Sequence, residues 1–399
     1  METKKHNGVI SLWKFIFAFG VVCCHIAEFA TIDPKKLIIP GGAIGVEFFF
    51  VVSGFLMCKK LMSYTEPSPN VGIEAGKYIW GKMKQLFPYV LIGCILGILS
   101  RIIYEKWGLS SYAYSIIDGL FLRMTGVKYV AVNGPTWYIS SMLLCMLLIY
   151  PFLRKNREKY VYIAAPLITI MVLGWLNKNM GLSLKGPMVM VDKFTYKGNL
   201  RALAELNLGI FLYPLCMKFS KIKISNFGRA LLTLIQVFCF AMPLVLSYFV
   251  ERVTHYDIFL LASVTIGIFI SFSGQLYGMK LCGNKFFAHL ERLSLPMFTV
   301  HYPIARFIGK RIVMDQNGYY KGFLLIFVIA IVVAEILLYV IEGCRRRKVL
   351  PRVFGRLFVK PEGRTVSYEK QEGDTRFYIT AVMLSLAVVA AVAAMFMTR

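Results

Sequence analysis

The chain has 399 residues, of which 57% are hydrophobic and only 17% are charged, and its formal net charge is +25. Soluble domains carry about 25% charged residues, whereas apolar runs of about 20 residues recur along this chain, as spanning helices require. The composition therefore predicts an all-α polytopic membrane protein and excludes a β-barrel, and the positive charge indicates basic loops beside membrane lipids with no nucleic-acid partner.

The apolar runs predict about eleven spans. Taken in chain order, they cover residues 9–30, 42–61, 79–103, 135–154, 160–177, 199–218, 229–250, 257–273, 288–312, 321–342 and 376–397. With a cytoplasmic N-terminus, the inside loops hold about 28 Lys and Arg residues against about 15 outside, as the positive-inside rule requires. We expect a multi-pass protein of the plasma or inner membrane, with the C-terminus outside.

The first predicted span carries three ionisable residues, Lys14, His25 and Glu28. Such residues are costly in a membrane and usually face other protein or a water-filled cavity. Lys14 and His25 are eleven residues apart, so they share one helix face at a separation of about 16 Å along the axis. Glu28 follows His25 by one turn. The spacing predicts a catalytic face, with a cation near the cytoplasmic surface and an imidazole with its carboxylate near the outer surface.

Two further spans carry ionisable residues. Glu47 lies in the second span at a depth comparable to that of His25, where it either supports His25 or belongs to a buried ion pair. On the sixth span, Arg201 and Glu205 are four residues apart and predict an ion pair within the helix.

Basic and aromatic residues mark the predicted membrane surfaces. The basic, amphipathic segment 77–88 contains Lys82 and Lys84, and we expect it at the inner interface, with the third span entered at Pro88. Trp137 begins the fourth span at the outer interface, where it either anchors the helix or stacks on a sugar.

The ninth span contains His301 between two prolines, Pro296 and Pro303. Proline has no N–H and interrupts the hydrogen bonding of a helix. We expect exposed carbonyl groups near His301. The His301 side chain either forms a structural hydrogen bond with these carbonyl groups or positions an acyl group or an acceptor. The nine cysteines include no CxxC pair, and no local spacing suits a metal, so we expect no metal site.

Four segments, in this order, resemble the type-3 membrane acyltransferases, bacterial O-acyltransferases that modify cell-surface polysaccharides. They are a basic residue followed by ten others and a histidine (Lys14 to His25), GVEFFFVVSGF at 45–55, GPTWYISSMLL at 134–144, and LSLPMFTVHYPI at 293–304. Each is weak alone, but the four together in a polytopic chain are specific. The resemblance covers roughly residues 8–342 and implies a core of about ten helices.

The resemblance also implies a reaction. An acyl group, acetyl or succinyl, passes from cytoplasmic acyl-CoA, with acetyl-CoA the first candidate, to a hydroxyl group of an extracytoplasmic polysaccharide or glycolipid. We expect His25 to act as the general base, with Glu28 and His301 as further catalytic residues. The resemblance assigns coenzyme phosphates to Lys14, Lys82 and Lys84, and we expect Glu47 and Trp137 on the acceptor side.

The expected organisation is a membrane acyltransferase core at residues 1–342, a basic cytoplasmic linker at 343–375 and an extra C-terminal transmembrane helix at 376–399. The alternative is a transporter or exporter of an envelope sugar or lipid, in which the same charged residues line the path of the solute. Many secondary transporters show inverted repeats, and this sequence shows none, which favours the enzyme.

Overall fold

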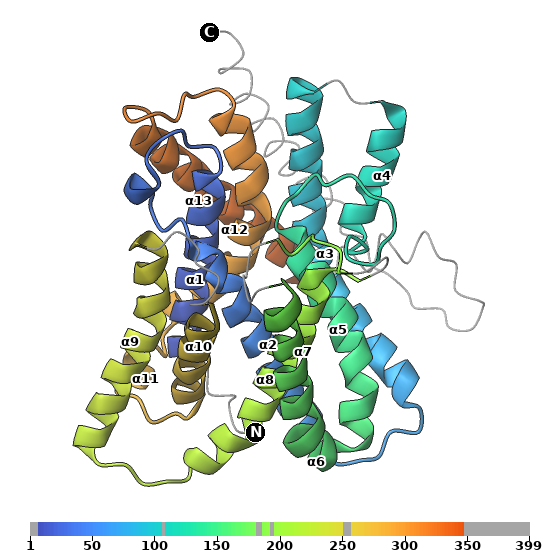
Figure 1. The fold of residues 1–399 in the computed structure, drawn as a ribbon, viewed down its shortest axis with the longest axis vertical. Helices are drawn as coiled ribbons and strands as arrows, with labels where there is room; N and C mark the ends of the chain where they lie inside the picture. Colours follow the sequence, from blue (N-terminus) through green and yellow to red (C-terminus); the bar gives the residue numbers. More distant parts are fainter. Residues whose placement is uncertain (1–6, 106–107, 181–185, 192–194, 250–256, 347–399) are drawn as a thin grey trace, which may run out of the picture. The chain divides into compact units, whose positions relative to one another are not determined.

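The computed structural model describes residues 7–105, 108–180, 186–191, 195–249 and 257–346. These residues form helices, and their only β-type pairing is an isolated bridge between Met190 and Tyr196. The chain divides into two compact units, residues 1–330 and 331–399. Helices α1 to α12 belong to the first unit (Figure 1), and the described residues of the second, 331–346, form the end of α13.

Each of the first ten predicted spans coincides with a helix. The long helices are α1 (Gly8–Ala27), α2 (Gly45–Met62), α3 (Val71–Tyr104), α5 (Thr136–Lys155), α7 (Ala165–Met180), α8 (Lys197–Phe219), α9 (Asn226–Phe249), α10 (Asp257–Phe272), α12 (Lys285–Gly309) and α13 (Tyr319–Arg346). The shorter helices are α4 (Leu109–Gly119), α6 (Arg157–Lys159) and α11 (Gly278–Leu281), and a π-helical turn, Tyr160–Ala164, joins α6 to α7.

Eight helical segments are long and apolar enough to cross a membrane, which confirms an all-α, multi-pass membrane protein. Helix α10 has only 16 residues and α12 is not among the eight. The predicted eleventh span, residues 376–397, lies outside the described residues, as does most of the predicted linker.

Helix α3 begins eight residues before the predicted third span, 79–103. It is a single helix of 34 residues, capped by Asn70, whose side chain accepts a hydrogen bond from the backbone N–H of Ile73 at 3.0 Å. At about 1.5 Å per residue it is about 50 Å long, well beyond the hydrocarbon thickness of about 30 Å. Pro88 removes one backbone donor without ending the helix.

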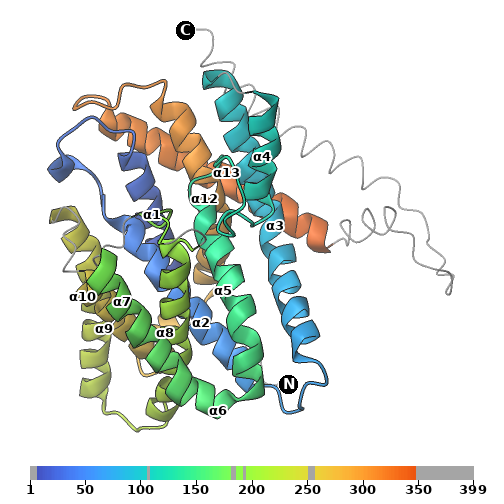
Figure 2. The ribbon, with the colours of Figure 1, turned by 45° about the vertical axis from the view of Figure 1, so that its right-hand side comes forward.

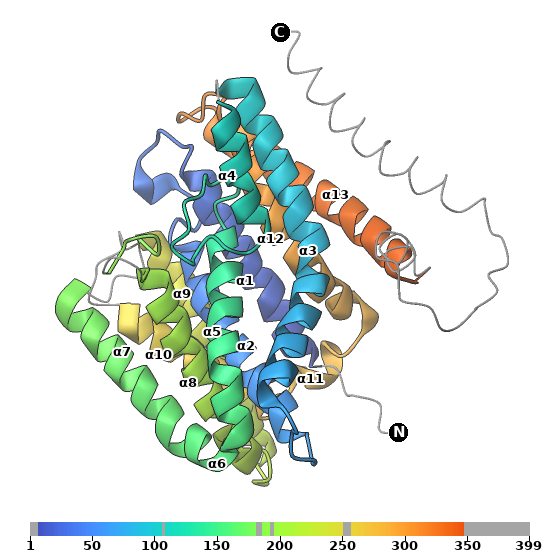
Figure 3. The same cartoon turned by 90° about the vertical axis from the view of Figure 1, so that its right-hand side faces the viewer.

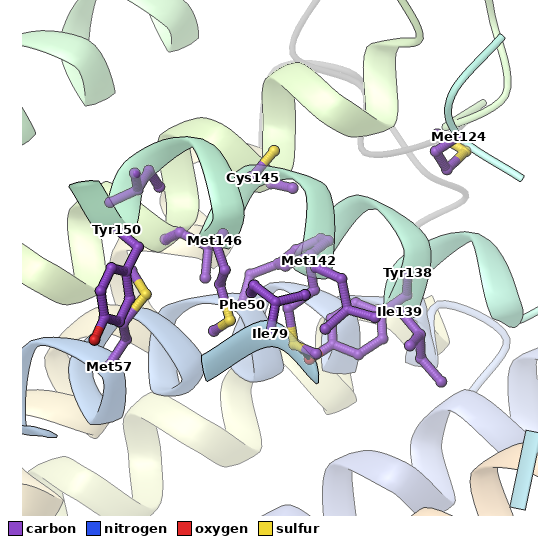
Figure 4. Packing of buried hydrophobic residues seen from close by; sticks show 14 of the residues in the cluster. Phe50, Met57, Ile79, Met124, Tyr138, Ile139, Met142, Cys145, Met146 and Tyr150 are labelled. Atoms are coloured by element: carbon purple, nitrogen blue, oxygen red, sulfur yellow. Dashed lines mark hydrogen bonds between the residues drawn. The ribbon is translucent and has the colours of Figure 1, made fainter. Parts of the chain in front are cut away.

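Helices α2 and α8 pack closely at the centre of the first unit. Gly54 of α2 lies against the backbone of Leu206, and Gly209 of α8 lies against the backbone of Val51, so that a Cβ atom at either glycine would collide with the facing carbonyl oxygen. Small residues let membrane helices approach in this way. Figure 4 shows the adjoining core, where side chains of α5 such as Met142 pack near Phe50.

Helix α12 packs against both α1 and α3, and Figures 2 and 3 show the three helices from two further sides. Gly8, at the start of α1, lies against the backbone of Cys282, just before α12, and Phe29, after the end of α1, lies against Gly309 at the end of α12. The helices α1 and α12 therefore run in the same direction, side by side.

Candidate active site

Two histidines from α1 and α12 meet at one end of this parallel pair. The ring centroids of His25 and His301 are 5.3 Å apart, and the ring of Tyr302 lies 5.2 Å from that of His25. His301 is fully buried, whereas the His25 side chain keeps 19% of its exposure. We call this end of the first unit the His25 end. An imidazole pair here has one buried ring and one ring that solvent or substrate can reach.

The hydrogen bonds of the two rings indicate which nitrogen carries the proton when each ring is neutral. The Nδ1 atom of His25 lies 2.7 Å from Oε1 of Glu28, and the Nδ1 atom of His301 lies 3.1 Å from the carbonyl oxygen of Met297. Both partners are acceptors, so both Nδ1 atoms donate. Each neutral ring is then left with a lone pair on Nε2, and the Nε2 atom of His301 is buried without a hydrogen-bond partner among the described residues.

Helix α12 continues through both prolines of the ninth span, although its hydrogen bonding is interrupted at Pro303. Since Pro303 has no N–H, the carbonyl group of Thr299 loses its usual helical donor. The side-chain Nδ2 of Asn133 donates to this carbonyl instead, at 2.7 Å. The carbonyl groups near His301 thus remain bonded, in one case through a residue from a distant turn.

The turn that contains Asn133 is itself fixed by a buried carboxylate. Asp118, near the end of α4, accepts hydrogen bonds from the backbone N–H groups of Val132 at 3.0 Å and Asn133 at 3.1 Å. Sequence reasoning missed the contact of the Asn133 side chain with α12. The signal was the combination of a turn asparagine with a proline-containing span.

At the other end of the pair, Lys14 forms an ion pair with Glu291 of α12. Glu291 also accepts a hydrogen bond from the hydroxyl group of Ser11 at 2.5 Å. Lys82 of α3 is close enough for the positive charges of Lys14 and Lys60 to act on it. We call this end the Lys14 end. The structure thus brings Lys14 and Lys82 together at a site with excess positive charge.

Lys84 is not part of this group in the described structure. Its side chain is exposed, and its ammonium nitrogen lies 5.9 Å from the ring centroid of Trp80. A lysine beside an exposed tryptophan is typical of a membrane interface.

Glu291 is a site residue that sequence reasoning missed. The pair Lys14–Glu291 and the pair His25–His301 are separated by eleven residues on α1 and by ten on α12. Both separations are about three turns, or 15 to 16 Å, so the two helices keep their register from one end of the site to the other. The signal was a carboxylate in a predicted span, the same signal that identified Glu28 and Glu47.

Glu47 forms a buried ion pair with Arg201 of α8, whereas the carboxylate bonded to His25 is that of Glu28. Arg201 lies closer to Glu47 than to Glu205, whose Oε1 is 3.8 Å from the guanidinium Nε. The guanidinium carbon is also 5.8 Å from the ring centroid of Trp137, and all four side chains are buried. Of the two interpretations of Glu47, the structure has the ion pair, and acceptor binding by Glu47 and Trp137 stays a prediction.

In the described part of the chain, no group of three or more His, Cys, Asp or Glu residues is arranged to hold a metal ion. The candidate site contains imidazole, carboxylate and ammonium groups on a few neighbouring helices. These groups suit proton transfer at the His25 end and anion binding at the Lys14 end.

The fold and site define a multi-pass membrane protein with paired imidazoles at one end of two parallel helices. In a comparison with protein families, residues 7–342 match the type-3 acyltransferase domain. The chain belongs to this family, and it is by membership a membrane acyltransferase. No match was found among curated proteins or among solved structures.

Proposed function

We propose that this protein transfers an acyl group, acetyl or succinyl, from cytoplasmic acyl-CoA to a hydroxyl group of an extracytoplasmic polysaccharide or glycolipid. The observation that carries the proposal is His25 itself, partly accessible and with Nδ1 bonded to Glu28. A neutral imidazole held in this tautomer has its Nε2 lone pair available as a general base. The family supplies the acyl chemistry.

In the proposed reaction, the acceptor hydroxyl donates a hydrogen bond to Nε2 of His25. Its oxygen attacks the carbonyl carbon of the thioester, a C–O bond forms, and the hydroxyl proton moves to Nε2. The tetrahedral intermediate then collapses, the C–S bond breaks, and the thiolate of CoA takes the proton from the imidazolium. The carboxylate of Glu28 stabilises the imidazolium between these steps, as the aspartate of a catalytic triad does for its histidine.

The donor is proposed to bind with its phosphates at the Lys14 end. Lys14, Lys60 and Lys82 offer three positive charges there, and lysines bind phosphates as point charges. Glu291 holds Lys14 when no donor is bound, and a phosphate group would replace this carboxylate. The acylated arm of the coenzyme then has to extend along α1 over about three turns to reach His25.

The test is transfer of radiolabelled acetyl or succinyl groups from the corresponding acyl-CoA to envelope glycan, with membranes that contain the wild type, His25→Ala or His289→Ala at equal expression. His289 is a matched control, because it belongs to α12 but takes no part in the histidine pair. We expect labelled glycan with the wild type and the control, and a loss with His25→Ala of about 10² to 10⁴-fold.

Label that persists with His25→Ala would remove His25 as the base. A complete absence of label from both donors, together with a solute flux that requires His25, would contradict acyl transfer and favour transport.

A further inference from the structure

Three tyrosine side chains surround one arginine close to the histidine pair. The arginine is Arg123, in the segment between α4 and α5. The tyrosines come from three separate parts of the chain, because Tyr129 belongs to the same segment as Arg123, Tyr196 directly precedes α8, and Tyr302 belongs to α12. We call these three residues the tyrosine cluster. The guanidinium carbon of Arg123 lies 5.3 Å from the ring centroid of Tyr129.

Electrostatic interactions bring the other two tyrosines close to the same arginine. Tyr129 and Arg123 both act on the hydroxyl group of Tyr196. Several charges act on the hydroxyl group of Tyr302, and in the order of their effect they are those of Glu28, Arg306, Arg101 and Arg123. The three side chains of the tyrosine cluster therefore lie around Arg123.

The position of Arg123 is fixed by buried groups. Its Nη1 atom donates hydrogen bonds to the carbonyl oxygens of Asn133 at 2.7 Å and Gly134 at 2.9 Å. The same atom lies 3.7 Å from Oδ1 of Asp118, and both side chains of this ion pair are buried. Arg123 is therefore a fixed and charge-balanced support for the ring of Tyr129.

The tyrosine cluster adjoins the proposed general base. A Cβ atom at Gly134 would lie 3.0 Å from the ring of Tyr302, so this ring packs directly on the turn whose carbonyl groups hold Arg123. The same ring lies 5.2 Å from that of His25, centroid to centroid. A ligand that extends along the cluster therefore reaches His25.

The hydroxyl groups of the tyrosine cluster are available to a ligand. Within the residues that the structure describes, none of the three forms a hydrogen bond, and none is among the buried polar atoms without a partner. The three side chains are half-buried. Elsewhere in the fold, Tyr104, Tyr150 and Tyr319 use their hydroxyl groups to connect segments of the protein.

Partly exposed tyrosines suit a sugar. Each offers an apolar ring face and a hydroxyl group that donates and accepts hydrogen bonds. A sugar unit is complementary to both, because its ring faces carry C–H groups and its rim carries hydroxyl groups. Tyrosines also anchor helices at membrane interfaces, but anchoring does not require three segments of the chain to converge on one buried arginine beside a histidine pair.

We propose that the tyrosine cluster is a carbohydrate-binding subsite, in which a sugar unit of the acyl acceptor stacks on Tyr129 and bonds to the hydroxyl groups of Tyr196 and Tyr302. The hydroxyl group that His25 deprotonates belongs to this sugar unit or to the next one. The inference rests on the proposed function, because it names the acceptor-binding residues of the same site.

The test is the kinetics of acyl transfer by purified protein in nanodiscs, which leave both ends of the protein accessible. The acceptor is envelope glycan freed of its ester-linked acyl groups by mild alkali, and either this glycan or the acyl-CoA is varied. Tyr129→Ala removes the stacking ring and should raise KM for the glycan about three- to tenfold, with KM for acyl-CoA unchanged. Tyr196→Phe removes only a hydroxyl group and should raise KM for the glycan about threefold.

The matched control is Tyr114→Ala. Tyr114 belongs to α4, its side chain is 36% exposed, and Nζ of Lys128 lies 5.0 Å from its ring centroid. Its replacement therefore removes a similar contact between a cation and a ring in the same region of the fold. Because Tyr114 does not belong to the tyrosine cluster, we expect both KM values to stay at those of the wild type.

A second measurement depends neither on variants nor on catalysis. Tetranitromethane nitrates accessible tyrosines, and mass spectrometry of the wild-type protein reports each tyrosine separately. We expect the deacylated glycan to lower nitration of the tyrosine cluster and to leave nitration of Tyr114 unchanged.

An unchanged KM for the glycan with both Tyr129→Ala and Tyr196→Phe, an equal rise with Tyr114→Ala, or nitration of the cluster that the glycan does not lower would each overturn the subsite. Transfer by the wild type in any of these cases leaves the proposed function in place. If the wild type transfers no acyl group, the proposed function fails, and the nitration result alone then supports or overturns the carbohydrate subsite.

Discussion

The contact between His25 and Glu28 leads to a quantitative prediction for Glu28→Gln. The Nδ1–Oε1 distance is 2.7 Å, but the Glu28 side chain is 48% exposed, and solvent weakens its electrostatic effect on the ring. Exposed ion pairs contribute about 0.2 to 1 kcal/mol, and 1.36 kcal/mol corresponds to a tenfold change in rate. We therefore expect kcat/KM to fall only about 1.4- to fivefold.

This outcome differs from that of a buried triad. Where the carboxylate partner of a catalytic histidine is buried, its replacement by the amide costs about 10⁴-fold in kcat. The amide oxygen of glutamine can still accept a hydrogen bond from Nδ1, so the tautomer of His25 is preserved in the variant. What the variant loses is the screened charge of Glu28.

The assay is the initial rate of labelled acyl transfer in membranes, for the wild type, Glu28→Gln and His25→Ala at equal expression. The reasoning is refuted if Glu28→Gln loses as much activity as His25→Ala, because the carboxylate would then act as a buried group. It is also refuted if Glu28→Gln is as active as the wild type while Glu28→Ala is inactive, because the hydrogen bond alone would then carry the effect.

Three further predictions concern packing, acid stability and the donor. Gly93→Ala places a Cβ about 2.6 Å from Nδ2 of Asn133 and should lower the free energy of unfolding by about 1–3 kcal/mol, as measured by thermal unfolding. Gly76→Ala has no neighbour within 4 Å of its Cβ and should stabilise α3 slightly. The pKa of Glu105 is below its ordinary value because neighbouring arginine and lysine side chains outweigh its burial, so the ionised Glu105 stabilises the fold fully above about pH 5, and this stabilisation should disappear towards pH 2. The melting temperature of Glu105→Gln should lack the fall that Glu105 causes over this pH range in the wild type. Lys14→Gln should raise KM for acetyl-CoA about threefold with little change in kcat. Glu291→Gln should lower KM for acetyl-CoA.

The helices were predictable because their signal is local. Apolar runs of about 20 residues identify membrane helices without knowledge of their neighbours, and the first ten predicted spans each coincide with a helix. The continuity of α3 through Pro88 and of α12 through Pro303 was not predictable in this way. A proline breaks a helix unless another group bonds the freed carbonyl, and at Thr299 that group is Asn133, more than 160 residues away in the chain.

The candidate site was predictable on α1 and only partly elsewhere. Helical spacing places Lys14 and His25 on one face, and a carboxylate one turn from a histidine predicts the contact of Glu28. Partners on other helices need the tertiary arrangement. The sequence alone cannot show that Glu47 lies beside Arg201 and not beside His25, or that Glu291 lies beside Lys14.

The parallel pairing of α1 and α12 connects the two ends of the candidate site. The Lys14–Glu291 pair and the His25–His301 pair belong to the same two helices. The close contacts of Gly8 with the backbone of Cys282 and of Gly309 with the Phe29 side chain fix their register. Parallel neighbours require an odd number of crossings between them. Helices α2, α3, α5, α7, α8 and α9 provide six, so α10 has to provide the seventh despite its 16 residues. A sliding movement of one helix along the other would separate both pairs at once. The distance between the Lys14 end and the His25 end is therefore set by rigid helices, and in the proposed reaction the acylated arm of the coenzyme has to be long enough to span it.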